Sequence, residues 1–363
     1  MGYKANFEVV LFDFYRWTRK VSGMKKRRKA FGKKPFSNAL TKEQEKEVLA
    51  FYKPYAKPSL DFHRYFTGVS GVFHASYIPQ DILIGYIDPY FNDIIAAKFY
   101  DNKTCYDALF HDIPQPRTLL KRVNNIWLDS DNRPLFKEGN TNLSDGVSFS
   151  VNIGCFVKEA QKSSGGSVVN YIPPGQFSFQ KVLEIANEYN TDVIVQEELV
   201  QHEGMARLHQ SSLNTLRIYS VLGKNGNTTI YSAVVRMGSG NGKLDNYSAG
   251  GLTCGIQSNG RLRKYGYNKT FEKMDRHPTS NIEFSEYEIP NYKEAVELVK
   301  KAHPMIAHFR SVAWDIAIRK DGTPVLIEAN LCRGGIDSLQ LNNGPLYGED
   351  TIKILNEVFG RNN

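Results

Sequence analysis

The sequence predicts an α+β protein with two or three lobes. Its 363 residues are enough to build more than one substantial hydrophobic core. Segments in which apolar and polar residues alternate, as in β-strands, are interspersed with segments of helical periodicity such as 291–309 and 349–359. The hydrophobic content of 41% and the charged content of 23% are typical of a soluble globular protein.

The first 60 residues predict a basic, helical N-terminal extension. Eleven Lys and Arg and no acidic residue lie between Phe14 and Lys42. Such a segment is either a solvated helix or an attachment to an anionic surface, for which membrane lipid, a lipid-linked pyrophosphate or nucleic acid are candidates. Because nothing downstream resembles a nucleic-acid-binding module, we expect no nucleic acid partner.

The cysteines and the apolar segments indicate the cellular compartment in which the protein functions. The four cysteines are widely spaced and form no CxxC pair: Cys105, Cys155, Cys254 and Cys332. This spacing argues against a disulfide framework and against a zinc site, and it is typical of a protein in a reducing environment. No apolar run approaches the roughly 20 residues that span a bilayer, and residues 1–13 lack the features of a signal peptide. We therefore expect a cytoplasmic protein, peripheral at the inner face of the membrane if the basic segment binds lipid.

Three regions follow the extension. Residues 61–105 are aromatic and irregular, and they predict a small mixed α/β segment. Residues 106–200 predict an N-terminal lobe in which a strand ends at Lys158, and a polar loop, a helix at 177–189 and a buried strand follow. Residues 201–363 predict a C-terminal lobe with two hairpins, a glycine-rich stretch and two helices.

Two carboxylates and an amide converge in the hairpin predicted at 312–330. The dipeptide Asp321-Gly322 is a strong signal for a two-residue turn. That turn would place Asp315 directly opposite Glu328, with Asn330 on the same face as Glu328. Because like charges opposite each other destabilise a sheet, the pattern predicts a divalent cation such as Mg²⁺ between these oxygens. A solvated hairpin face is the alternative.

Lys158 and the Ser-Ser-Gly-Gly-Ser loop shortly after it suit a nucleotide phosphate. The lysine supplies a positive charge, and the backbone of Ser164, Gly165 and Gly166 can turn several N–H groups toward phosphate oxygens. The lysine precedes the glycines, so this is not a Walker A motif. An ordinary Gly-Gly hairpin turn is the alternative.

A strand that leads into two glutamates, "VIVQEELVQHEG", predicts a site for adenine. Gln196 or Glu197, with the backbone near Leu199, would hold the base. His202 or Glu203 would take the ribose hydroxyls. The alternative is an ordinary strand that leads into a loop.

Two arginines fall on one face of the hairpin predicted at 214–236. Asn225-Gly226 marks its turn, and any even-numbered loop places Arg217 and Arg236 opposite or diagonal to each other. Because neighbouring guanidinium groups repel, the pair predicts an anion between them, either a transferring phosphoryl group or a carboxylate. Surface cations paired with nearby acids are the alternative. The glycine-rich stretch that follows is a substrate loop or a pair of turns, with the candidates Asn246, Gly250 and Gly251.

The order of these elements resembles the ATP-grasp superfamily over residues 100–345. In that family one lysine lies in an Asp-Lys helix start, which Asp101-Asn102-Lys103 resembles with one residue inserted. A second lysine ends the strand before a flexible loop, as Lys158 does. Two Mg²⁺ ions are held by an Asp and a Glu-x-Asn motif, which Asp315, Glu328 and Asn330 match.

Two local patterns narrow the resemblance. The spacing "TLR…R…N…GG" is similar to that of ribosomal-protein glutamate ligases. The segment "QEELVQHEGMARLHQSSLNTLRIYSVL" is most similar to the sugar-transfer-associated ATP-grasp family, which is found with polysaccharide biosynthesis genes. The first 60 residues match no domain of the superfamily.

The resemblance implies an ATP-grasp fold, in which two α+β lobes grip ATP, and a carboxylate–amine ligase that uses ATP and Mg²⁺. Lys103, Lys158 and the glycine loop would hold the ATP phosphates while a substrate carboxylate forms an acylphosphate. An amine would then displace phosphate. Arg217, Arg236 and Arg333 would stabilise the charge at the reacting centre. The expected substrates are an amino acid or other amine and a sugar acid of a capsular or lipid-linked glycan.

Two other interpretations stay open. One is a kinase on the same fold that phosphorylates a sugar or polyol. The other is a non-catalytic nucleotide-binding partner of a polysaccharide assembly complex, against which the intact set of Asp, Glu and Asn argues. The dependence of ADP release on an acyl acceptor would separate the ligase from the kinase.

Overall fold

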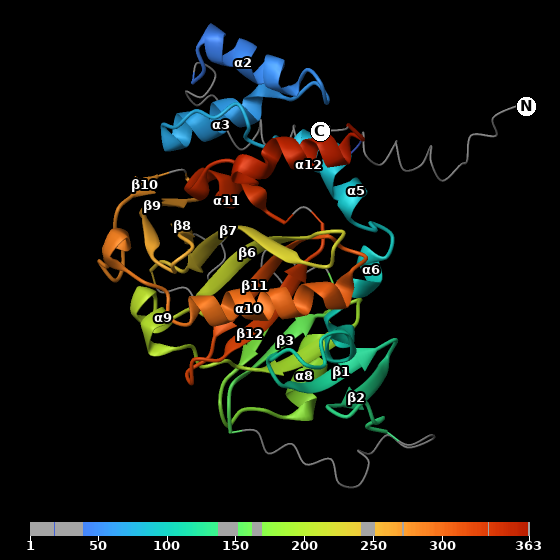
Figure 1. Cartoon of the computed structure of the whole chain (residues 1–363). Coiled ribbons are helices and arrows are strands. Elements are labelled where there is room, and N and C mark those ends of the chain that lie inside the picture. Colours follow the sequence, from blue (N-terminus) through green and yellow to red (C-terminus); the bar gives the residue numbers. More distant parts are fainter. Residues whose placement is uncertain are drawn as a thin grey trace, which may run out of the picture.

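The computed structural model describes residues 18, 39–136, 152–161, 169–240, 251–270, 272–332 and 334–361. Two sheets organise these residues, one of five strands and one of seven (Figure 1). Every strand pairing in both sheets is antiparallel. The α+β class predicted from the sequence is confirmed.

The N-terminal lobe is built on the five-stranded sheet, in the order β2-β1-β5-β3-β4. Its strands are β1 (Thr118–Val123), β2 (Ile126–Asp129), β3 (Cys155–Glu159), β4 (Val169–Ile172) and β5 (Val193–Glu197). Helix α8 (Phe179–Ala186) is capped by Ser178, whose hydroxyl accepts a hydrogen bond from the Lys181 N–H. Val182 and Ala186 of this helix pack in one core with Val195 of β5. The predicted helix and strands of this lobe are therefore present.

The C-terminal lobe is built on the seven-stranded sheet, in the order β10-β9-β8-β7-β6-β11-β12. Its strands are β6 (Thr215–Leu222), β7 (Thr228–Met237), β8 (Leu252–Ile256), β9 (Leu262–Asn268), β10 (Lys273–Met274), β11 (Ser311–Ile318) and β12 (Pro324–Asn330). The helices of the lobe are α9 (Glu203–Leu208), η5 (Phe284–Glu286), α10 (Tyr292–Ala302), η6 (His303–Ile306), α11 (Ile336–Asn343), η7 (Gly348–Asp350) and α12 (Thr351–Val358).

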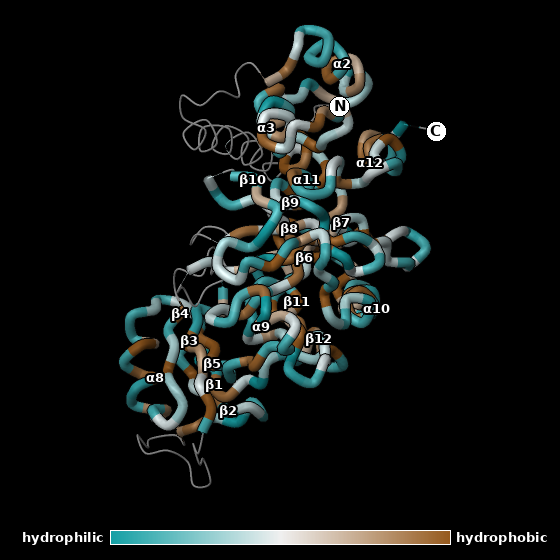
Figure 2. Tube along the Cα trace, turned by 90° about the vertical axis from the view of Figure 1, so that its left-hand side faces the viewer, coloured by the Kyte–Doolittle hydropathy of each residue, from teal (hydrophilic) through white to brown (hydrophobic). Residues whose placement is uncertain are grey.

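Both faces of the seven-stranded sheet are covered. Trp314 and Ile316 of β11 pack in one core with α10, whereas Ala313 packs in a second core with α11 and α12 (Figure 1). Figure 2 shows the hydrophobic positions concentrated between these layers. This double cover explains why all eight residues of β11 are buried. Within the described residues, no helix combines the length and apolar character that crossing a membrane requires.

The segment before the N-terminal lobe consists of helices. They are α2 (Lys42–Tyr52), α3 (Leu60–Ser70), α4 (Gln80–Ile82), η2 (Leu83–Ile87), α5 (Asp88–Phe91), α6 (Ala97–Tyr100), η3 (Lys103–Cys105) and α7 (Tyr106–Leu109). The mixed α/β structure expected at 61–105 therefore contains helices and no strand in the described chain. Phe62, Tyr65 and Phe66 lie on one buried face of α3, which is the spacing of a helix.

Asp315 and Glu328 are paired across β11 and β12, as predicted, but the turn and the register that produce this pairing differ from the prediction. The turn has an odd number of residues rather than two, because Ile318 pairs with Pro324. Gly322 occupies its left-handed position, with φ of 86°. A bulge next to Asp315 then shifts the register by one residue and restores the predicted pairing.

The hairpin of β6 and β7 follows the same pattern. Its loop is also odd-numbered rather than even, because Leu222 pairs with Thr228, and a bulge in β7 opposite Tyr219 and Ser220 compensates. Arg217 pairs with Val234, which places Arg236 two residues further along the same face. The predicted shared face is confirmed, and of the two predicted arrangements, opposite or diagonal, the structure has the diagonal one.

Candidate active site

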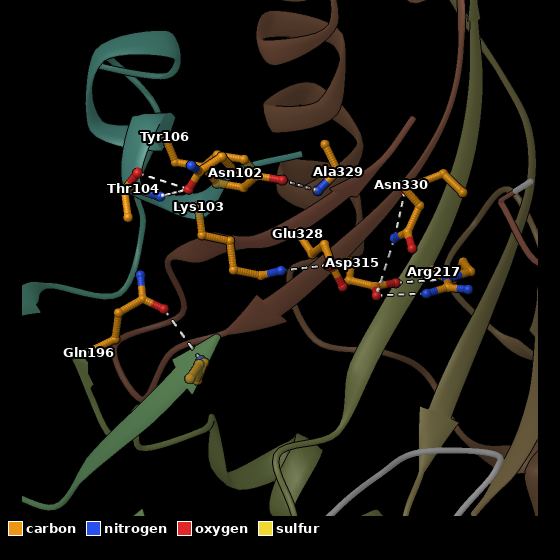
Figure 3. A network of polar contacts seen from close by, with 12 residues as sticks. Asn102, Lys103, Thr104, Tyr106, Gln196, Arg217, Asp315, Glu328, Ala329 and Asn330 are labelled. Carbon is orange, nitrogen blue, oxygen red and sulfur yellow. Dashed lines mark hydrogen bonds and ion pairs between the residues drawn. The ribbon is translucent and has the colours of Figure 1, made fainter. Parts of the chain in front are cut away.

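The candidate site lies where the two lobes meet, beside the β11–β12 hairpin (Figure 3). Lys103 connects the lobes. Its backbone N–H donates to the Ala160 carbonyl at 2.9 Å, just beyond β3, and its Nζ donates to Glu328 Oε1 at 2.7 Å on β12. The side chain of Lys103 is 7% exposed, so this ion pair is largely shielded from water.

Asn102 fixes the backbone that carries Lys103. Its Oδ1 accepts hydrogen bonds from the Thr104 N–H at 3.0 Å and the Thr104 hydroxyl at 2.8 Å, which makes it the N-cap of η3. Its Nδ2 donates to Asp192 Oδ2 at 3.1 Å. The residue that interrupts the Asp-Lys pattern in the sequence is therefore the one that caps the short helix.

Asp315 is held by two arginines. Its Oδ1 accepts from Arg217 Nε at 2.8 Å, and its Oδ2 accepts from Arg217 Nη2 at 2.7 Å and Arg236 Nη1 at 2.9 Å. Burial alone would raise the pKa of Asp315, but the charges of Arg217 and Arg236 outweigh burial and lower it to about 2. The anion between the two arginines is thus a side chain of the protein.

The two opposed carboxylates are each neutralised by a cation of the chain. Lys103 pairs with Glu328, and Arg217 and Arg236 pair with Asp315. The repulsion inferred from the sequence is therefore relieved without a metal ion. The residue types still fit a hard cation, because Asp315 is ionised and Asn330 keeps its amide oxygen as an acceptor, but in this structure the arginines and Asn330 occupy the Asp315 oxygens.

A cation at this point would rely on two carboxylates and one amide. Across the described part of the chain, no group of three or more His, Cys, Asp or Glu gathers in the geometry of a metal site. The set Asp315, Glu328 and Asn330 is all oxygen, which favours Mg²⁺ over zinc.

Lys158 lies on β3, on the N-terminal side of the site. Its Nζ donates to Gln196 Oε1 at 3.3 Å and lies 5.5 Å from the centre of the Phe156 ring. Burial, and then the charge of Lys103, lowers the pKa of Lys158 to about 8. Two ammonium groups that repel each other beside an apolar ring suit a polyanionic ligand.

The two candidates for the adenine contact point in opposite directions. Gln196 is buried and faces Lys158, whereas Glu197 Oε2 accepts from Arg117 Nε at 3.1 Å on the other side of β5. Gln196 is therefore the member of the pair on the side of the phosphate-binding lysine. The contact with adenine itself stays a prediction.

The chain after β5 crosses to the hairpin. The His202 N–H donates to the Ile318 carbonyl at 2.8 Å, and His202 Nδ1 accepts from the Gly204 N–H at 3.0 Å as the cap of α9. Leu199 is half-buried and Glu203 is exposed in the first turn of α9. Their predicted roles at the base and ribose remain predictions.

Several predicted site residues lie outside the described residues: Ser164, Gly165, Gly166, Asn246, Gly250 and Arg333. Gly251 is described and is buried directly before β8.

Two residues that sequence reasoning missed hold the hairpin in place. Asn92 Nδ2 donates to the carbonyls of Ser311, at 2.8 Å, and Leu331, at 2.7 Å, and so joins the start of β11 to the end of β12. The hydroxyl of Tyr106 accepts from the Ala329 N–H at 3.1 Å, between Glu328 and Asn330. No local sequence signal marks either residue, because both act through contacts more than 200 residues away along the chain.

A family profile described as "Sugar-transfer associated ATP-grasp" matches residues 91–351. The chain belongs to this family. The matched region contains both sheets and every residue of the two ion-pair clusters, Lys103–Glu328 and Arg217–Asp315–Arg236.

Solved structures similar to this ATP-grasp protein include several ligases. The L-amino acid ligase from Bacillus licheniformis is 13% identical with a TM-score of 0.40, over 71% of this chain and 47% of that chain. D-alanyl-alanine synthetase A from Vibrio cholerae is 16% identical with a TM-score of 0.39, over 73% and 66%. The ATP-grasp ligase PsnB, complexed with minimal precursor, is 15% identical with a TM-score of 0.36, over 73% and 63%.

This ATP-grasp chain spans less than two thirds of the length of each of these three structures. A comparison with curated proteins finds no match.

Proposed function

We propose that this ATP-grasp protein is an ATP-dependent carboxylate–amine ligase that forms an amide through an acylphosphate. The observation that carries the proposal is the convergence of four cationic side chains, Lys103, Lys158, Arg217 and Arg236, on the junction of the lobes around two carboxylates. Such a site can hold and transfer a phosphoryl group by charge alone, without a protein nucleophile.

ATP would bind between the lobes. Lys103 and Lys158 would take its phosphates, with the loop of Ser164, Gly165 and Gly166. Gln196 or Glu197 and Leu199 would contact the base, and His202 or Glu203 the ribose. Asp315, Glu328 and Asn330 would hold Mg²⁺, which neutralises phosphate charge when it is bound.

The reaction has two balanced steps. An oxygen of the substrate carboxylate attacks the γ-phosphorus, the bond to the β–γ bridging oxygen breaks, and ADP leaves. The amine then attacks the acyl carbon, phosphate departs with the bonding electron pair, and the amine nitrogen loses a proton. Arg217 and Arg236, with Arg333, would stabilise the negative charge on the reacting oxygens.

The three histidines that the sequence offers as a base, His202, His209 and His277, favour the ligase over a sugar kinase, which needs a base near the acceptor hydroxyl. His209 contacts the Ser212 hydroxyl at 2.8 Å with Nδ1 and the Gly240 carbonyl at 2.8 Å with Nε2. His277 contacts the Gly238 carbonyl at 2.9 Å with Nε2. Both are buried and held by structural contacts, as His202 is held by its capping role.

The proposed acid is a sugar acid, such as a uronic acid of a capsular or lipid-linked glycan, and the proposed amine is an amino acid. The description of the family as sugar-transfer associated supports the sugar, and the two arginines support its carboxylate. Asn246, Gly250 and Gly251 would contact this second substrate. The reaction would take place in the cytoplasm, at the inner face of the membrane if the glycan is lipid-linked.

Hydroxylamine tests the proposal, because it traps acylphosphates as hydroxamates. The full chain would be incubated with ATP, Mg²⁺, hydroxylamine and each of a panel of uronic acids. We expect a hydroxamate with the correct acid, and its loss in Arg217→Gln and Arg236→Gln. Arg310→Gln, directly before β11, is the control that should retain it. A phosphorylated sugar without hydroxamate would decide for the kinase.

A further inference from the structure

The carboxylate of Asp315 has no acceptor capacity left for another ligand. Its four donors are Arg217 Nε, Arg217 Nη2, Arg236 Nη1 and, at 3.4 Å, Asn330 Nδ2. A carboxylate accepts about four hydrogen bonds in total. The side chain is also 5% exposed, so a new ligand cannot reach it from solvent without moving a donor.

Glu328 differs from Asp315 in both respects. Its side chain is 25% exposed, and among the described residues its ion-pair partner is Lys103 alone. Figure 3 shows Lys103, Glu328, Asp315 and Arg217 in one row, so that a cation stands at each end of the two carboxylates. Each cation in the row is also a group that the proposed reaction requires for an anion of ATP or of the acid substrate.

We propose that Arg217 and Arg236 alternate between two anions, and that a divalent cation drives the exchange. In the free enzyme both arginines bind Asp315. A cation that binds Asp315 displaces them and makes them available to the carboxylate or acylphosphate of the second substrate. The inference rests on the proposed function, because it takes the site to be a metal–nucleotide site.

The exchange makes the metal and the acid substrate bind cooperatively. An arginine whose Nε and Nη2 grip Asp315 cannot present the same fork to a second carboxylate. The metal therefore raises the affinity for the acid, and by linkage the acid raises the affinity for the metal. The consequence is that the metal and the acid each bind more tightly when the other is present.

On the side away from Asp315, the guanidinium of Arg217 lies against Gly335. A Cβ placed on Gly335 would lie 2.7 Å from Arg217 Nη1, so any side chain there would crowd the guanidinium. Gly335 also has a left-handed φ of 65°, at the start of α11. Glycine at this position leaves Arg217 room beside the start of the helix.

The test measures binding of Mn²⁺ to the full chain in the presence of ADP, by electron paramagnetic resonance of the free ion. Arg217→Gln removes two of the four competing donors, so it should bind Mn²⁺ about tenfold more tightly than the wild type. Arg217→Lys keeps the charge but loses the fork, and should also bind more tightly. Arg310→Gln, which loses a charge directly before β11, should match the wild type.

Unchanged affinity in Arg217→Lys, or weaker binding in either Arg217 variant, would overturn the exchange. If the Arg217 variants do not fold, Arg236→Gln removes one donor and leaves Arg217 on Asp315, and it should still bind Mn²⁺ about threefold more tightly. The assay needs neither an acid nor turnover. Its failure is therefore distinguishable from the failure of the hydroxamate assay, which tests the ligase itself.

Discussion

The charged side chains of the site are neutralised by side chains of opposite charge from the same chain. Lys103 neutralises Glu328, and Arg217 and Arg236 neutralise Asp315. From the sequence, the pairing of two carboxylates suggested a strained hairpin that a metal would relieve. The structure reverses that expectation for the metal-free protein, because removing one carboxylate now leaves cations without a counter-charge.

The stability of Asp315→Asn tests this balance. The substitution leaves Arg217 and Arg236 facing each other in a mostly buried position, so the free energy of unfolding should fall by about 3 kcal/mol. Urea denaturation at pH 7 would measure it. Asp321→Asn is the matched control, because that carboxylate pairs with Arg319 on the surface, and its unfolding midpoint should stay at the wild-type value. An unchanged midpoint for Asp315→Asn would contradict the role of the two ion pairs.

The affinity for ADP should depend on pH through Lys158. Its pKa of about 8 means that it is mostly charged at pH 7 and mostly neutral at pH 9. A neutral amine does not attract phosphate, so the dissociation constant for ADP should rise about tenfold between these pH values. Calorimetry would show the trend. Lys158→Gln should bind ADP more weakly and lose this pH dependence, whereas Lys181→Gln, on the exposed face of α8, should behave as the wild type.

At the scale of elements, the face on which a strand residue lies was predictable, whereas the length and parity of the turns were not. Alternation together with assumed even-numbered loops predicted Asp315 opposite Glu328, and Arg217 opposite or diagonal to Arg236; the structure has the first pairing and the diagonal. Both hairpins nevertheless combine an odd-numbered loop with a bulge. A bulge depends on the pairing with neighbouring strands, and no local sequence pattern records that pairing. In each hairpin the wrong loop length and the missed bulge shift the register in opposite directions, so the two errors cancel.

Helices η3 and α7, which carry Lys103 and Tyr106, are held by a buried lysine of β1. Lys121 is 2% exposed, pairs with Asp107 Oδ2 at 2.5 Å and donates to the Thr104 carbonyl at 3.3 Å. Lys121→Ala should therefore lower the free energy of unfolding by about 2 kcal/mol and weaken ADP binding by displacing Lys103. Thermal denaturation and calorimetry would measure the two effects.

Lys181→Ala is the control for Lys121, because it removes an exposed lysine from the same lobe. It should change neither stability nor ADP affinity. A loss of stability in Lys121→Ala with ADP affinity intact would show that β1 does not position Lys103.

Over the whole molecule, the sequence predicted two lobes, but it did not predict how the helices before them pack against the lobes. Val48 and Tyr52 of α2 lie in the same core as Val234 of β7 and Leu355 of α12. The order of motifs along the chain carries no information about such packing. For the same reason Asn92 and Tyr106, which fix the hairpin, escaped prediction. Asp315 and Glu328 were predicted from the alternation of the two strands, and Lys103 from its resemblance to the Asp-Lys motif of the family.

Truncation separates the basic segment from the helices that the fold requires. Thr41 caps α2, and the Tyr52 hydroxyl donates to the Tyr77 carbonyl at 2.7 Å, so α2 is part of the folded structure. Deletion of residues 1–38 should therefore keep the thermal midpoint near that of the full chain. Deletion of residues 1–60 removes α2, exposes the core of the C-terminal lobe, and should abolish cooperative unfolding.

The shorter deletion also tests the attraction to an anionic surface. Nearly all of the eleven Lys and Arg between Phe14 and Lys42 precede its boundary. We expect the full chain to sediment with phosphatidylglycerol vesicles at low salt and to be released at high salt, because the attraction is electrostatic and screened by ions. The chain without residues 1–38 should stay in the supernatant. Equal sedimentation of the two proteins would place the lipid contact elsewhere, and no sedimentation of either would leave the segment a solvated extension.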